Sequence, residues 1–168
     1  AVFSDDIRDA LKGSVFEDKS TGFASGAANT LESVKFGIVA AGNHPQIDFA
    51  KVNYSKAPYT NAPSQVINYV SCHDNHTLYD KLKVSRPNAS EEDIIRMHKL
   101  ANTIVFTSQG IPFLHAGVEI KRTKGGEHNS FNKPDSVNRI DWEWKQTNAG
   151  LFDYYKDLVT FRKDHPAF

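Results

Sequence analysis

Short apolar runs and helix-spaced apolar positions alternate along this chain, and together they predict an α/β fold. Apolar residues stand side by side at residues 2–3, 66–70 and 111–114, and loop-forming residues bound each run. Runs of this length predict short buried strands. In four other segments apolar residues recur every three or four positions. This spacing predicts helices over residues 5–11 and 31–41, from Ser90 to a stop at Gly110, and over 149–163.

Polar residues that favour helix starts precede all four helical segments, and long polar loops separate the elements. The residues that can cap the helices are Ser4, Asn29 or Thr30, Ser90 and Asn148. Residues 14–28, 43–64 and 116–147 show neither helical nor strand periodicity and are predicted as loops. The order strand, helix, strand, helix predicts an open parallel sheet with crossover helices. Any chemistry is then expected at the carboxyl ends of the strands.

Composition narrows the range of functions. The chain has 168 residues, about the length of one domain, and equal numbers of basic and acidic residues, 20 each. A net charge of zero argues against a nucleic-acid partner, and no apolar stretch approaches the roughly 20 residues of a membrane span. The first residues lack initiator Met and signal-peptide character, so we expect a piece of a longer protein. Secreted, periplasmic and cytoplasmic locations all remain open.

The densest group of reactive side chains follows the second predicted strand. His73, Asp74, Asn75 and His76 stand together directly after it. Three interpretations fit: a polar loop tip, a metal site of a small metal-dependent hydrolase using His73, Asp74 and His76, or a substrate clamp. In the clamp, imidazole and carboxylate donate to and accept from adjacent hydroxyl groups. The spacing alone does not choose among them.

Four segments resemble the α-amylase family of glycoside hydrolases. Residues 69–75 (YVSCHDN) resemble the fourth signature region of that family, at the end of the seventh strand of a (β/α)8 TIM barrel. Residues 3–13 (FSDDIRDALKG), 109–119 (QGIPFLHAGVE) and 129–142 (NSFNKPDSVNRIDW) resemble the sixth strand, the eighth strand and the following loop of type I pullulanases and related debranching enzymes. One departure is Val118, where pullulanases commonly have Asp.

The resemblance implies roles for particular residues. Asp74 matches the acidic residue that stabilises the transition state by holding sugar hydroxyls, and His73 matches an imidazole that binds the same sugar. Asn75 lies beside them, with a less defined substrate-binding role. The other implied substrate-binding residues are Asp135, Asn138 and Arg139. An ion pair of Arg139 with Asp141 or Asp135 is an equally acceptable interpretation. The resemblance implies neither a cofactor nor a metal ion.

The resemblance also implies an incomplete site. The nucleophile and the general acid of the family stand on the fourth and fifth strands, which match no residue of this chain. A TIM barrel takes about 250 residues, so residues 1–168 are expected to be its C-terminal part, with strands six to eight in an open sheet. We therefore expect an inactive fragment of an α-1,6-glucosidase for pullulan, starch or glycogen, which self-associates through its strand edges. The rival interpretation is a non-catalytic carbohydrate-binding or interaction domain.

Several other aromatic residues and histidines admit both packing and functional interpretations. Trp142 and Trp144 are either a platform for sugar rings or a packing pair with one ring buried and one half-buried. His115 is as suited to packing as to a site role. His98 is expected to be an ordinary polar helix position.

Overall fold

The computed structural model describes residues 1–168 and contains one small parallel sheet. Its strands are β1 (Val2–Phe3), β2 (Val66–Asn68) and β3 (Ile111–Pro112), in the order β1-β2-β3. Val2 pairs with Val66, and Ile67 pairs with Ile111, both in parallel. The outer edges of β1 and β3 have no partner strand. The predicted α/β class with an open parallel sheet is thus confirmed.

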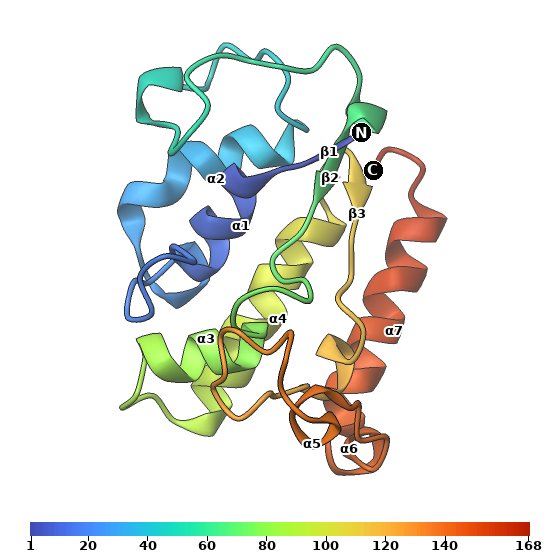
Figure 1. Cartoon of the computed structure of the whole chain (residues 1–168). Coiled ribbons are helices and arrows are strands. Elements are labelled where there is room, and N and C mark those ends of the chain that lie inside the picture. The colour runs from blue at the N-terminus through green and yellow to red at the C-terminus, as the bar shows by residue number, and fades with distance from the viewer.

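Five helices of at least two turns surround the sheet. They are α1 (Asp5–Lys12), α2 (Leu31–Ile38), α3 (Leu78–Ser85), α4 (Glu91–Phe106) and α7 (Ala149–Asp164). Two single-turn helices, α5 (Asp135–Asn138) and α6 (Trp144–Thr147), lie in the long loop before α7. Figure 1 shows α1 and α2 on one side of the strands and α7 on the other. None of the helices has the length and apolar character needed to cross a bilayer.

Short 3-10 turns complete the backbone. They cover Phe23–Ser25, Ala28–Thr30, Phe49–Lys51, Pro63–Gln65 and Val118–Ile120. All lie outside the five longer helices. Backbone hydrogen bonds within these turns, such as that from the Val52 amide to the Phe49 carbonyl, order the segments that contain them.

The four predicted helices are confirmed, although α2 and α4 end earlier than expected, and three further helices, α3, α5 and α6, were missed. Helix α2 ends at Ile38 because Ala40 and Ala41 adopt left-handed conformations, with φ of 53° and 57°. Two strands are also shorter than the apolar runs predict: β2 ends at Asn68 and β3 at Pro112, and the last hydrogen bond between them runs from the Phe113 amide to the Asn68 carbonyl. The longest of the missed helices is α3, which Thr77 caps by accepting the Asp80 amide at 3.2 Å.

The core divides into two clusters of buried apolar residues. The larger unites α1, α3, α4 and α7 through residues such as Ile7, Leu82, Ile94 and Tyr155. The smaller joins Phe36 of α2 to Val66 of β2 and to residues of the loop that follows α2. The outer strands leave Val2, Phe3 and Ile111 exposed, whereas Val66 in the central strand is fully buried. The edges of the sheet are therefore apolar as well as unpaired.

The expectation for His98 is wrong, because its side chain is fully buried between α4 and α7. The Tyr155 hydroxyl lies 2.9 Å from His98 Nδ1, and the Asn102 amide donates to that hydroxyl at 2.6 Å. His98 Nε2 has no hydrogen-bond partner. Burial, and then repulsion from Lys121, lowers the pKa of His98 to about 3.

Candidate active site

The candidate site lies beyond the carboxyl end of β2, where the chain turns back through residues 71–76. His73 Nε2 lies 3.3 Å from Asp74 Oδ2, and their side chains are 86% and 68% exposed. Asn75 adopts a left-handed conformation with φ of 61°, which bends the chain directly after Asp74. The imidazole and the carboxylate are therefore adjacent and both accessible to a ligand.

His73 and Asp74 line a polar pocket of about 200 Å³ together with residues from the loop before α5. The loop contributes Arg122, Lys124 and Phe131, among others, and α5 contributes Asn138. Of the predicted site residues, the structure thus brings together His73, Asp74 and Asn138. Asn75, Asp135 and Arg139 do not line this pocket. Their role in substrate binding stays a prediction.

A buried lysine fixes the backbone of the site. Lys124 Nζ donates to the His73 carbonyl at 2.8 Å and to Ser130 Oγ at 2.6 Å. Burial, and then repulsion from Arg122, lowers the pKa of this ammonium group. Lys124 therefore joins the segment that carries Asp74 to the loop that forms the opposite wall of the pocket.

Helix α3 holds that loop in place through one buried carboxylate. Asp80 accepts from Thr123 Oγ1 at 2.5 Å and from the Lys124 amide at 2.7 Å. The sequence interpretation missed Asp80 because it missed α3, and it missed Lys124 because that residue lies in a loop without periodicity. A signal was present, since Thr77 followed three residues later by Asp80 is a variant of the capping box.

The far end of the site segment is held in the interior. His76 is buried, with Nε2 3.0 Å from the Gly126 carbonyl and Nδ1 3.7 Å from Asp18 Oδ1. Lys12 Nζ donates to the His76 carbonyl at 3.5 Å. Burial, and then repulsion from Arg8, lowers the pKa of Lys12 to about 8. The alternative interpretation as a metal site using His73, Asp74 and His76 does not fit the structure, because the clustered ligand atoms belong to Cys72, His73 and Asp74.

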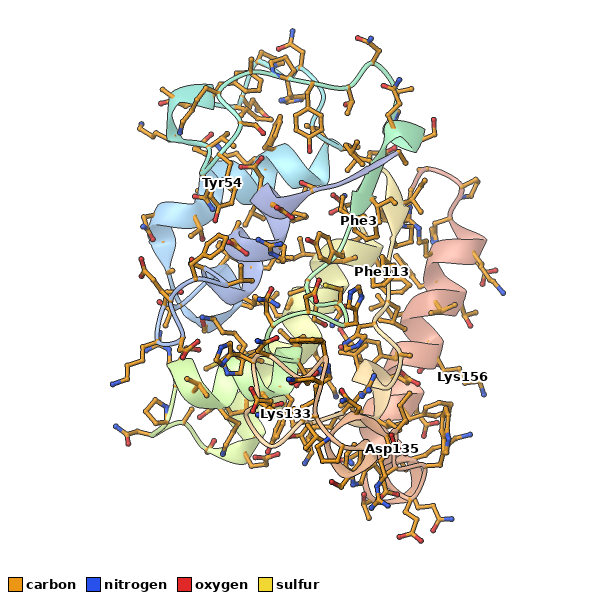
Figure 2. All side chains as sticks on the ribbon, viewed as in Figure 1. Phe3, Tyr54, Phe113, Lys133, Asp135 and Lys156 are labelled. Carbon is orange, nitrogen blue, oxygen red and sulfur yellow. The ribbon has the colours of Figure 1, made fainter.

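The loop around α5 carries the other predicted residues. Asn138 Nδ2 donates to the carbonyls of Ser130 and Lys133, at 2.7 and 3.1 Å, and so shapes the pocket wall. Arg139 lies 3.6 Å from Asp141, as the ion-pair interpretation expects. Asp135 is exposed at the first position of α5. Figure 2 shows it near Lys133, at the end of the molecule away from Phe3 and Tyr54.

The remaining aromatic and histidine candidates lie outside this pocket. Trp142 is 66% exposed and Trp144 is half-buried, so the expected buried ring of a packing pair is not found. His115 is buried, 3.4 Å from Arg122 Nη1. Burial, and then repulsion from Arg122, lowers the pKa of His115 to about 4. Its contacts are those of a packed residue beneath the pocket wall.

Fold and site together define an α/β segment with a polar pocket beyond the carboxyl end of a parallel strand. No protein-family model matches the chain. The pullulanase of Bacillus subtilis is 39% identical over 166 residues, which is 99% of this chain and 22% of that protein. The solved structure of that pullulanase with maltose has a TM-score of 0.91 at 38% identity, over 99% of this chain and 22% of that one.

A second solved pullulanase structure matches the chain equally well over its length. The pullulanase of Paenibacillus barengoltzii in complex with maltohexaose and α-cyclodextrin has a TM-score of 0.88 at 45% identity, over 99% of this chain and 25% of that one. The chain is therefore homologous to a segment of the pullulanases, and the resemblance inferred from the four motifs is confirmed. It spans about a fifth of the length of these curated relatives.

Proposed function

We propose that residues 1–168 form strands six to eight, with their helices, of a (β/α)8 catalytic barrel. The complete enzyme would be a retaining glycosidase that hydrolyses α-1,6 branch points in pullulan, starch or glycogen. Three parallel strands in sequential order, with helices between them, support this placement. The match to pullulanase structures over 99% of the chain supports it further.

One observation carries the functional argument: an exposed carboxylate and an exposed imidazole lie side by side in a polar pocket. Asp74 accepts hydrogen bonds from the hydroxyls of the sugar at the cleaved subsite, and His73 binds the same sugar. The bonds to Asp74 strengthen as the ring distorts toward the oxocarbenium-like transition state. Asn138 lines the same pocket, while Asn75, Asp135 and Arg139 add contacts further along the α-glucan. The maltohexaose and maltose of the related complexes support a substrate of this class.

We further propose that the chain does not hydrolyse pullulan by itself. A retaining glycosidase needs a nucleophile and an acid/base whose carboxyl groups are about 5–5.5 Å apart. Asp74 is the only carboxylate that lines the pocket. One carboxylate can stabilise charge but cannot also act as nucleophile and proton donor.

A chimaera tests the assignment directly. The chain replaces the matching segment of the B. subtilis pullulanase, and release of reducing sugar from pullulan is measured. We expect an active chimaera, and a loss of about 10²–10³-fold in kcat for Asp74→Asn, the range seen when one group that stabilises a transition state is removed. Asp157→Asn, an exposed carboxylate on α7, is the matched control. Equal activity of the two variants would contradict the role of Asp74.

The isolated chain distinguishes the proposal from a carbohydrate-binding domain. Calorimetric titration with maltohexaose should show negligible affinity, because most subsites of the relatives lie outside this fifth of their length. Tight binding that tolerates Asp74→Ala would favour the binding domain. Hydrolysis of pullulan by the chain alone would contradict the proposed inactivity.

A further inference from the structure

Three potential metal ligands of different chemistry meet at the tip of the site segment. The ligand atoms of Cys72, His73 and Asp74 all lie within 4.8 Å of one another. His73 Nε2 and Asp74 Oδ2 are already 3.3 Å apart. Cys72 is the only cysteine of the chain, and its Sγ lies 3.9 Å from the Asp74 carbonyl rather than in a disulfide.

We propose that Cys72, His73 and Asp74 form a binding site for a thiophilic divalent cation such as Zn²⁺. One thiolate, one imidazole and one carboxylate make a ligand set that Zn²⁺ accepts, with water in the fourth position. The exposed side chains of His73 and Asp74 leave room for that water. Ca²⁺ and Mg²⁺ prefer oxygen ligands alone and are expected to bind poorly here.

Two buried lysines lie near the cluster. Lys12 and Lys124 are buried and lie near Cys72, and attraction to its sulfur opposes the lowering of their pKa values by burial. Both ammonium groups repel an incoming cation, which limits the affinity of the site. The thiol proton passes to the buffer as the sulfur–metal bond forms, and no oxidant or reductant is required.

The site has a consequence for catalysis, which rests on the proposed function. The same atoms of His73 and Asp74 cannot coordinate a metal ion and hold sugar hydroxyls at once. A bound ion would therefore compete with the α-glucan, so the site would be inhibitory rather than catalytic.

Cobalt titration of the chain tests the site without any activity measurement. Co²⁺ bound to a thiolate gives a sulfur-to-metal charge-transfer band, and with a single cysteine this band reports Cys72 alone. The chain is titrated with Co²⁺ under a non-thiol reductant, and then with Zn²⁺, Ca²⁺ or Mg²⁺ as competitor. We expect a 1:1 band that Zn²⁺ abolishes and that Ca²⁺ and Mg²⁺ leave unchanged.

Single substitutions test which side chains bind the metal ion. Cys72→Ser should abolish the band, and His73→Gln and Asp74→Asn should each weaken binding about tenfold or more, since loss of an outer-shell partner alone costs about that much. His128→Gln removes an exposed imidazole of the same pocket that lies outside the cluster, and should leave binding unchanged. No band, or an affinity that neither His73→Gln nor Asp74→Asn changes, would overturn the proposal. Either result leaves the glycosidase assignment intact, because the chimaera tests that separately.

Discussion

Burial of His98 should make the stability of this protein depend steeply on pH below neutrality. The imidazole is fully buried and its Nε2 has no partner, so a second proton would place a buried charge without compensation. Burial lowers the pKa of His98 from its ordinary 6.5 to about 3. Between these two values the unfolded chain binds a proton that the folded chain does not. The contribution of neutral His98 to the free energy of unfolding is therefore complete above about pH 6.5, and it is lost as the pH falls toward 3.

The size of the effect follows from linkage. Between pH 7 and pH 5 this one group should lower the free energy of unfolding by about 2 kcal/mol. His98→Leu removes the titrating group while keeping an apolar side chain between α4 and α7. The substitution itself changes the free energy of unfolding by some amount at pH 7. At pH 5 the free energy of unfolding of the variant, relative to that of the wild type, should be about 2 kcal/mol more favourable than at pH 7.

Urea unfolding followed by circular dichroism at both pH values measures this difference. Ile94→Val is the matched control, since Ile94 is fully buried on the same helix and carries no titrating group. It should cost about 0.5–1.5 kcal/mol at either pH. The reasoning would be refuted if the difference between His98→Leu and the wild type were the same at pH 7 and pH 5.

Three further predictions concern packing, the site loop and the strand edges. Gly37→Ala should cost about 1–3 kcal/mol in urea unfolding, because its Cβ would lie 2.4 Å from Ile7 Cδ1. Gly150→Ala, with no atom within 4 Å, should instead stabilise by up to about 1 kcal/mol. Lys124→Met should destabilise by about 1–3 kcal/mol and speed amide exchange in residues 71–77, whereas Lys156→Met on the surface of α7 should do neither. Light scattering should show self-association that Val2→Lys reduces, because Val2 is exposed on an unpaired strand edge; a monomer at high concentration would contradict this.

Local signals in the sequence were sufficient to predict most of the longer helices, but not which residues the helices contact. Ser90 caps α4 by accepting the Asp93 amide at 3.1 Å, as its pattern predicts. The spacing of His98 from Ile94 and Ala101 places it on the buried face of the same helix, so its burial could have been predicted. Its partner Tyr155 could not, because that contact joins residues 57 positions apart.

The site was predictable to the extent that its residues are neighbours in the sequence. His73 and Asp74 follow a buried strand, so the sequence showed both that reactive side chains gather there and that they lie at the end of a strand. The opposite wall of the pocket was not, because its loop has no periodicity and is held by Asp80 from another helix. The ligand cluster likewise depends on the turn at Asn75, which turns His76 inward and leaves Cys72 beside Asp74.

The sheet also has a consequence for the order of folding. Its pairs join Val2 to Val66 and Ile67 to Ile111, and no strand pairs with a neighbour that is close along the chain. Each pairing must close a long loop to form only two residue pairs, so the entropic cost of closing the loop comes before a small energetic gain. Helices α4 and α7, with sixteen residues each, need no such closure. We therefore expect the helices to form first and the sheet last, so that His73 and Asp74 come together with their pocket only at the end of folding.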